Sequence, residues 1–308
     1  MRKDFVNEVA KLQRISRADL VEKDIILQEM LVDLSRNNFF SGNFAFKGGT
    51  CLTKCYLGYF RFSEDIDFTW KNQKVFEGKS QKAIRGYLSE IIDNIGDIFG
   101  DISAKRGLDF RCQKNNRTYV ELGGGNKTCT FKIWYQSEIL DRRSFVKVQI
   151  NFVEKILFPI QRTQLRSLVG KAPEELKALF PEHSEYWQEL AFNVYDIKEI
   201  LCEKIRSILT REGLKARDFL DVYLICKAYG IKLKDTRAPA IAKTRFALDL
   251  YEKYRKNLAD KKNAIVSAQT FRWGEEKSLL LQDIDEEGFY RFLKDLNAFL
   301  KDVVEELA

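Results

Sequence analysis

The stretch FKGGTCLTKCYLGYFRFSEDIDF, residues 46–68, decides the fold because it joins two unlike patterns. Gly48 and Gly49 end a short aromatic strand, and a predicted helix follows them. Asp65 and Asp67 alternate with apolar residues, so in a strand their carboxylates project from one face. A glycine turn before a helix and a carboxylate pair on a strand therefore lie close together in the chain.

This combination suits the chemistry of nucleotidyl transfer. Carboxylate oxygens are preferred ligands of Mg²⁺-type cations, which activate an attacking hydroxyl and stabilise a leaving pyrophosphate. A glycine turn lets the backbone N–H groups approach a triphosphate closely. Taken alone, two glycines are usually only a turn, and an acidic strand is usually only solvent-facing. Their order and spacing make the two together more specific than either one.

The flanking sequence predicts a mixed α+β domain followed by a helical domain. We assign residues 1–165 to the first domain and 166–308 to the second, with Pro159 and the polar stretch after it near the boundary. Helices are predicted over 18–36, with Ser16 as N-cap, and over 50–57, 80–99, 173–180, 185–192, 196–210, 216–229, 238–259 and 286–306. Strands are predicted over 44–47, 61–70, 110–113, 119–122, 129–135 and 145–152, with a hairpin at Gly123–Asn126.

Composition excludes several classes of protein. The chain has 308 residues, of which 45% are hydrophobic and 13% aromatic, so disorder is excluded. No apolar run approaches the roughly 18 residues that span a bilayer, and the N-terminus lacks the apolar core of a secretory signal. We therefore expect a cytoplasmic protein.

Cysteine and histidine usage restricts the chemistry further. The six cysteines form no C-x-x-C pair, and Cys51 and Cys55 have no histidine nearby, so we expect buried thiols there rather than a zinc site. His183 is the single histidine, which argues against His-dependent triads and multi-histidine metal sites. Catalysis must then use carboxylates, lysine, serine or a hard metal ion.

The net charge of +7 is unevenly distributed. Residues 102–147 hold ten Lys or Arg against four acids, which is nearly the whole excess. Such a segment suits a polyanion such as RNA, although charge alone favours a solvated basic surface.

The motifs resemble those of the AbiEii/AbiGii-type toxins, which include MenT-like toxins, within the DNA polymerase β-like nucleotidyltransferase superfamily. The resemblance rests on residues 46–68, on VEKD at residues 21–24, and on Glu203-Lys204 followed by KARDFLD at residues 215–221. It implies a metal-dependent toxin of a bacterial toxin–antitoxin or abortive-infection system. Such an enzyme transfers nucleotides from an NTP to RNA, with the tRNA 3′ end as the favoured acceptor. It also implies a cognate antitoxin with a winged-helix DNA-binding pattern.

The resemblance implies roles for particular residues. Mg²⁺ or Mn²⁺ would bind to the catalytic Asp65 and Asp67. In the helical domain Lys204 would contact phosphate, Asp218 would position the substrate or Lys204, and Asp221 would help to bind the nucleotide. The other expected nucleotide-binding residues are Lys47, Gly48, Gly49, Thr50, Arg61 and Ser63. By itself, Lys204 reads as a solvent-facing lysine, and Asp221 as the surface partner of Arg217 four residues before it.

One departure from the superfamily concerns a third carboxylate. The strand expected to supply it, residues 145–152, has Lys147, Gln149 and Asn151 on its polar face and no acid. Glu121 and Glu154 are the nearest alternatives, and the general base stays unidentified. An inactive nucleotide- or RNA-binding protein and a transferase acting on a protein target therefore remain open. A purely structural adaptor would leave the paired motifs as coincidence.

Overall fold

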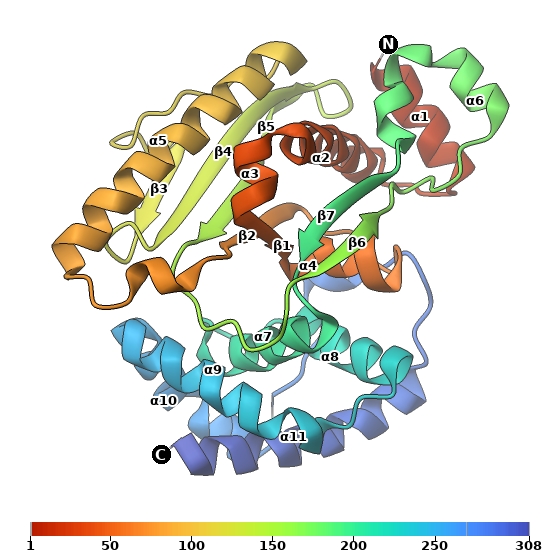
Figure 1. The fold of residues 1–308 in the computed structure, drawn as a ribbon. Coiled ribbons are helices and arrows are strands. Elements are labelled where there is room, and N and C mark those ends of the chain that lie inside the picture. The colour runs from red at the N-terminus through yellow and green to blue at the C-terminus, as the bar shows by residue number, and fades with distance from the viewer. Residues whose placement is uncertain (1, 269, 308) are drawn as a thin grey trace. The chain divides into compact units, whose positions relative to one another are not determined.

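The computed structural model describes residues 2–268 and 270–307, which divide into two compact units (Figure 1). The first unit comprises residues 1–153 and 160–194, and the second comprises residues 154–159 and 195–308. Each unit has its own hydrophobic core. No described helix combines the length and apolar character that crossing a membrane demands.

A mixed sheet forms the centre of the first unit. Among the described residues it has seven strands in the order β3-β4-β5-β2-β1-β7-β6. Their bounds are β1 Phe44–Lys47, β2 Asp65–Trp70, β3 Val120–Gly123, β4 Thr128–Ser137, β5 Arg142–Asn151, β6 Gln161–Leu165 and β7 Leu190–Val194. The β2–β5 and β1–β7 pairs are parallel, and the other pairs are antiparallel. The α+β class predicted from the sequence is confirmed.

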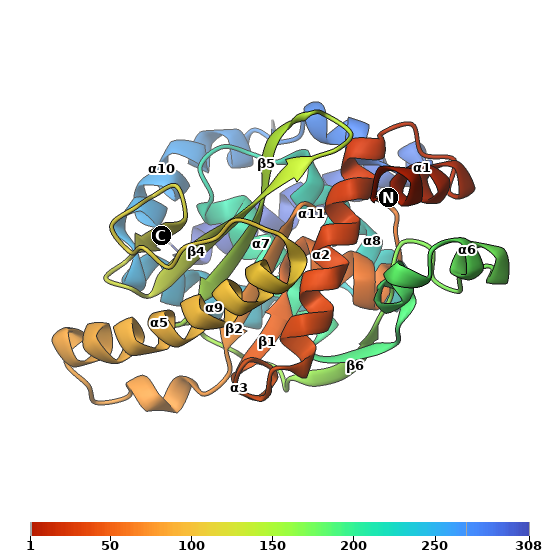
Figure 2. The same ribbon diagram turned by 90° about the horizontal axis from the view of Figure 1, so that it is seen from above.

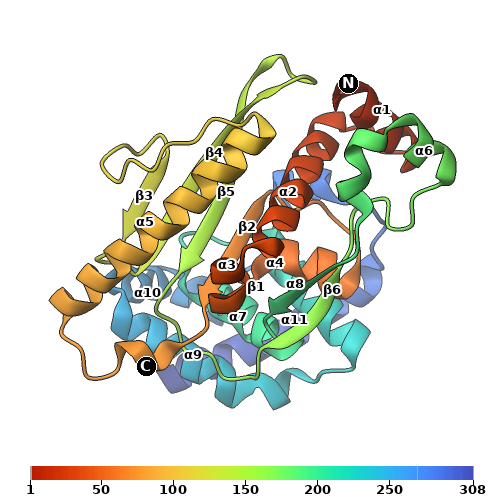
Figure 3. The same cartoon turned by 45° about the horizontal axis from the view of Figure 1, so that its top comes forward.

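Helices α2 and α5 cover one face of this sheet, as Figure 2 and Figure 3 show, and the first unit has further helices around them. Their bounds are α1 Arg2–Leu12, α2 Ala18–Arg36, α3 Asn38–Asn43, α4 Gly48–Cys51, α5 Gln81–Arg106 and α6 Glu174–Leu179. Aromatic rings fill the interface: Phe99 of α5 lies 5.0 Å from Phe131 of β4, and Phe40 of α3 lies 4.7 Å from Phe68 of β2.

Strand alternation separates the two faces of the sheet. Ile66, Phe68, Val148 and Ile150 point to the helix-covered face and are fully buried. The residues between them point to the opposite face, which we call the carboxylate face because it includes Asp65 and Asp67. Local pleating alone thus assigns the carboxylates to the side away from the core.

Where the structure describes the second unit, five α-helices build it. They are α7 Ile197–Thr210, α8 Ala216–Tyr229, α9 Arg237–Leu250, α10 Glu252–Val266 and α11 Glu286–Leu307. Helix α7 packs against α8, α9 and α10, so its buried residues lie at the centre of this unit.

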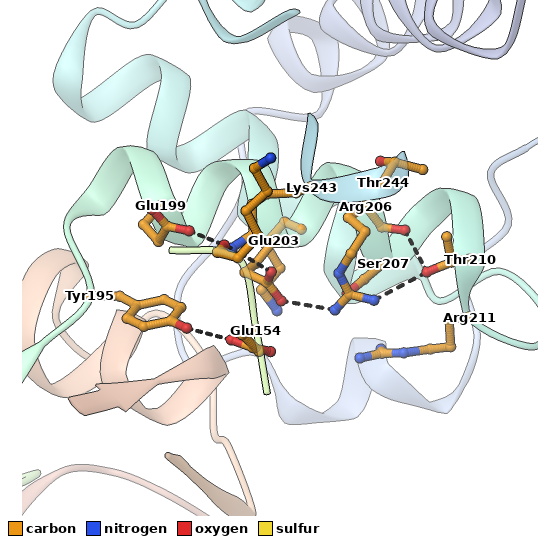
Figure 4. A network of polar contacts seen from close by, with 12 residues as sticks. Glu154, Tyr195, Glu199, Glu203, Arg206, Ser207, Thr210, Arg211, Lys243 and Thr244 are labelled. Carbon is orange, nitrogen blue, oxygen red and sulfur yellow. Dashed lines mark hydrogen bonds and ion pairs between the residues drawn. The ribbon is translucent and has the colours of Figure 1, made fainter. Parts of the chain in front are cut away.

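An ionic network ties residues 154–159 to the second unit (Figure 4). Glu199 accepts hydrogen bonds from the backbone N–H groups of Leu157 and Phe158 at 2.8 and 2.7 Å. The buried Lys243 pairs with Glu199 and Glu203 and donates to the Lys155 carbonyl. These bonds satisfy the backbone of a segment that has no secondary structure of its own.

The structure differs from several sequence predictions. The first unit extends to Val194 instead of ending near residue 165, because β6 and β7 pair with each other and β7 joins the sheet. The helix predicted over 185–192 is wrong, since the chain forms a short 3₁₀ segment to Trp187 and then β7. Residues 110–113 form no strand, and Asp109 makes only an isolated bridge to Trp134. The helix predicted over 238–259 is two helices, which separate at Tyr251.

The helix after the glycine turn also differs from the prediction. It begins at Gly48 and changes to a π-helical turn at Leu52–Leu57 instead of running regularly over 50–57. Ser16 does not cap α2, whose N-cap is Arg17 without a side-chain bond. The hairpin at Gly123–Asn126 is confirmed: Gly124, Gly125 and Asn126 all have positive φ between β3 and β4.

Candidate active site

The first glycine of the turn is packed against a carboxylate. Gly48 has φ +78°, a conformation that side chains rarely adopt. A Cβ atom there would overlap the Asp67 carboxylate. The preceding residue, Lys47, is buried and lies directly opposite Asp67 in the antiparallel pairing of β1 with β2. The sequence needs glycine at position 48 for its backbone angle and for its close approach to Asp67.

The second glycine faces two other predicted residues. A Cβ atom on Gly49 would lie 2.7 Å from Arg61 Nη2 and 3.0 Å from Ser63 Oγ. Arg61 is 2% exposed and donates to the Phe62 carbonyl at 2.9 Å. Thr50 is buried as well: its hydroxyl donates to the Asp65 carbonyl and lies 2.8 Å from Ser63 Oγ, from which it can accept a hydrogen bond. The structure thus brings Lys47, Gly48, Gly49, Thr50, Arg61, Ser63, Asp65 and Asp67 together.

Asp65 and Asp67 suit a hard divalent cation. Both residues are partly exposed on the carboxylate face, and the donor set is oxygen only. Among the described residues, no group of three or more His, Cys, Asp or Glu can hold a metal ion. Two carboxylates alone would not fill the coordination sphere of such a cation, so further oxygen ligands would have to come from elsewhere.

The neighbouring strand shows what replaces a third acid. In the parallel register of β2 with β5, Asp65 lies beside Lys147 and Asp67 beside Gln149. Glu121 lies on β3, with β4 and β5 between it and β2, and it pairs with Lys132 at 2.5 Å. Glu154 belongs to the second unit, where it accepts a hydrogen bond from Tyr195. Lysine and glutamine thus occupy the positions beside the carboxylate pair, as the sequence indicated.

The remaining predicted residues form a buried cluster in the second unit. Lys204 Nζ on α7 lies 2.6 Å from Asp221 Oδ2 and 3.1 Å from Asp218 Oδ1 on α8. Arg211 pairs with the other oxygen of Asp218 at 2.7 Å. Burial by itself would raise the pKa of Asp218, but the charges of Lys204 and Arg211 outweigh it and lower the pKa.

This cluster excludes the simpler interpretation of the same residues. Asp221 is fully buried and pairs across helices with Lys204, so it is not a surface partner of Arg217. Lys204 is 8% exposed and is not a solvent-facing lysine. An ammonium group has three N–H donors, so with two directed at aspartates it can donate one more bond.

A second buried network behind the turn was not predicted from the sequence. Lys54, in the π-helical turn, is fully buried and pairs with Asp24 of α2 at 2.9 Å. Tyr59 donates to Asp24 at 3.0 Å, and burial followed by the Asp24 charge raises the pKa of this phenol. Cys51 and Cys55 are buried nearby as expected, and burial raises the pKa of the Cys51 thiol. The VEKD motif was the available signal, because Asp24 is its last residue.

Half of the ten basic residues in the segment 102–147 pair with carboxylates. Lys105 and Arg106, at the end of α5, pair with Asp33 of α2. Lys114 pairs with Asp93 at 2.6 Å. Acids outside and inside the segment therefore neutralise much of its charge, and only part of it is available to a polyanion.

Comparison with known proteins agrees with this geometry. No curated protein sequence matches the chain. Among solved structures, MenT4, a nucleotidyltransferase toxin from Mycobacterium tuberculosis H37Rv, is similar with a TM-score of 0.61 and 21% identity, over 96% of this chain and 89% of that one. JHP933 from Helicobacter pylori gives a TM-score of 0.44 and 15% identity, over 94% of each chain. The family profile described as nucleotidyl transferase AbiEii toxin, type IV toxin–antitoxin system, matches residues 30–308. The chain therefore belongs to the AbiEii family and is a nucleotidyltransferase toxin of a type IV toxin–antitoxin system.

Proposed function

We propose that this toxin transfers nucleotides from an NTP to an RNA acceptor, with the tRNA 3′ end as the favoured class. The observation that supports this best is the packing of Gly48 against Asp67. It puts the partly exposed Gly48-Gly49 turn beside a carboxylate pair, so one bound triphosphate can meet both.

In this proposal Mg²⁺ or Mn²⁺ binds to Asp65 and Asp67. When bound, the metal supplies positive charge that offsets the charge developing on the phosphates. Gly48 and Gly49 hold the triphosphate through the backbone. Thr50 and Ser63 keep the turn against β2, because Thr50 bonds both Ser63 and the Asp65 carbonyl.

Two buried cations support the turn. Lys47, opposite Asp67, offsets part of the negative charge of the carboxylate pair. Arg61, which lies under Gly49, adds positive charge behind the backbone that holds the triphosphate. Both are charges that a low-dielectric environment makes effective.

Lys204 of the helical domain is proposed as a further phosphate ligand. Asp218 and Asp221 position its ammonium and hold it charged, because both aspartates lie within ion-pair distance of it. The proposal requires Lys204 and Asp65 to act on one bound nucleotide. The double variant Lys204→Met with Asp65→Ala then loses hardly more activity than Asp65→Ala alone, whereas independent roles give multiplied losses.

The RNA acceptor, the cytoplasmic location and a winged-helix antitoxin complete the proposal. The direct test incubates the chain with total RNA and each labelled NTP, with and without Mg²⁺ or Mn²⁺. Metal-dependent label in RNA, absent with Asp65→Ala, supports it. Label in protein instead of RNA contradicts the acceptor and favours a protein-modifying transferase.

A second candidate, a nucleotide- or RNA-binding protein without turnover, rests on one observation. Gln149 and Lys147 stand beside the carboxylate pair at the positions where a third acid would serve as general base. Tight NTP binding without incorporation into RNA or protein favours this candidate.

A further inference from the structure

The carboxylate face continues beyond Asp65 as a strip of alternating basic and aromatic residues. Lys147 and Phe145 follow one another on this face of β5, and Lys132 and Trp134 lie directly opposite them on β4. We call these four residues the basic–aromatic strip. All four are partly exposed, and helices α2 and α5 cover the other face of the sheet.

Contacts within the strip hold its rings and cations in place. The Trp134 and Phe145 rings lie 4.6 Å apart, and the Lys147 ammonium lies 5.8 Å from the Phe145 ring centre. The guanidinium of Arg143 lies 4.5 Å from the Trp134 ring centre. Trp134 also donates its indole N–H to the Thr118 carbonyl at 2.8 Å. The aromatic platform is therefore fixed before any ligand binds.

The charge of the strip is partly compensated. Lys132 pairs with Glu121, and Arg143 pairs with Asp109. Lys147, in contrast, has no carboxylate partner among the residues that the structure describes, although it lies beside Asp65 in the sheet register. The surface next to the carboxylate pair thus presents a cation with unused hydrogen-bond donors.

A shallow polar cavity, largely open to solvent, adjoins the strip. Its volume is about 660 Å³, and its lining is Gln113, Asn115, Asn116, Arg117 and Thr118. Lys132 donates to the Arg117 carbonyl at 3.1 Å, and Trp134 donates to Thr118, so the cavity wall is bonded directly to the strip. Side-chain amides can donate to and accept from base edges, and Arg117 adds a cation for phosphate.

The order of the strands places the basic–aromatic strip and the glycine turn on opposite sides of the carboxylate pair. In the sequence β4-β5-β2-β1, the glycine turn follows β1 on one side of the carboxylates, and the strip lies on the other side. In nucleotidyl transfer the attacking oxygen and the leaving pyrophosphate lie on opposite sides of the reacting phosphorus. When Gly48 and Gly49 hold the triphosphate, the acceptor therefore approaches from the side of the carboxylates where β5 lies.

We propose that the basic–aromatic strip binds the unpaired 3′ end of the acceptor RNA, with bases stacked on Trp134 and Phe145 and a phosphate bound by Lys147. This inference rests on the proposed RNA acceptor and adds where the RNA binds. From strand spacing, Trp134 lies about 12 Å from Asp65, within reach of the last few nucleotides. Stacking on aromatic rings tolerates any base, and the cavity is where selection among bases occurs.

The test measures binding without turnover. Asp65→Ala is the background, without divalent metal, and the probe is a labelled stem-loop RNA with an unpaired 3′ end. Trp134→Ala should weaken RNA binding about ten-fold or more. Lys147→Gln should weaken it less and reduce the slope of log K against log salt by about 0.7–0.9. Affinity for a fluorescent NTP, measured with Mg²⁺ in the chain with Asp65 intact, should stay unchanged in both.

A matched control separates the strip from general charge. Lys79 stacks on Tyr87 with its ammonium 4.8 Å from the ring centre, and Tyr87 belongs to α5 on the opposite face. Lys79→Gln removes the same charge and the same kind of contact, and RNA affinity should not change. Thermal melting checks that Trp134→Ala still folds, and Lys147→Gln gives a second, milder variant.

Three results overturn the inference. Unchanged RNA affinity and salt slope in both strip variants would move the RNA elsewhere. An equal loss of NTP affinity in Trp134→Ala would assign the platform to the base of the incoming nucleotide. Absence of RNA binding in the parent chain would contradict the proposal that the acceptor is RNA. Loss of binding in the strip variants alone would not contradict that proposal.

Discussion

Two pairs of aspartates in this chain have opposite surroundings. Asp65 and Asp67 alternate on a strand and are partly exposed beside a glycine turn. Asp218 and Asp221 lie one turn apart on α8, are buried, and pair with Lys204. In the proposed function a ligand completes the first pair, whereas Lys204 and Arg211 of the protein itself neutralise the second. The difference predicts that the first pair governs activity and the second also governs stability.

The largest expected effect comes from removing the first pair. Asp65→Ala or Asp67→Ala should lower nucleotide transfer by about a thousand-fold or more, because the metal-binding charge disappears. Without metal, the melting temperature should stay the same or rise, since two adjacent carboxylates repel each other. Labelled-NTP incorporation and thermal melting measure the two effects. Full activity in Asp65→Ala would contradict the metal-site assignment.

The second pair should behave in the opposite way. Asp221→Ala leaves the buried Lys204 short of a partner, so the free energy of unfolding should fall by about 3 kcal/mol. Urea denaturation measures this change, with Asp65→Ala as the control that keeps its stability. If Asp221→Ala unfolds at the same urea concentration as the parent chain, the contrast between the two pairs is lost.

The glycine turn offers a sharper test of the first pair. Gly48→Ala introduces backbone strain of about 1–3 kcal/mol and pushes against Asp67, so transfer activity should fall strongly. Gly58 has nearly the same φ, +77°, but open space around its Cα. Gly58→Ala therefore incurs the same kind of strain without the clash. Equal activity in the two variants would show that close approach to Asp67 is unimportant.

The smallest expected effect concerns Glu185, a partly exposed carboxylate that, like Asp218, pairs with two cationic side chains. Hydrogen bonds from Arg36, together with Arg106, lower the pKa of Glu185 to about 2 from an ordinary 4.5. Its stabilisation is therefore present above about pH 4.5 and is lost as the pH falls toward 2. Glu185→Gln should flatten the stability profile in that window, as followed by urea denaturation. An unchanged profile would mean that these ion pairs add nothing to stability.

Local pattern was enough for much of the first unit. The helix over residues 18–36 and the strand over 44–47 have the predicted bounds, because periodicity and glycine punctuation act over a few residues. The same alternation placed Asp65 and Asp67 on one face. The helix predicted over 185–192 was wrong because β7, which begins at Leu190, exists only through pairing with β1 and β6, which lie far away in the sequence.

The sequence by itself determined the glycine turn, the carboxylate pair and the absence of a third acid on β5, since each depends on neighbouring residues and backbone geometry. Only the tertiary structure decided that Lys204 is buried between Asp218 and Asp221, and that Lys54 pairs with Asp24. It also decided that Trp134 and Lys147 share a face with Asp65. These facts depend on helix packing and strand order, and contacts between distant segments form only where the folded chain brings them together.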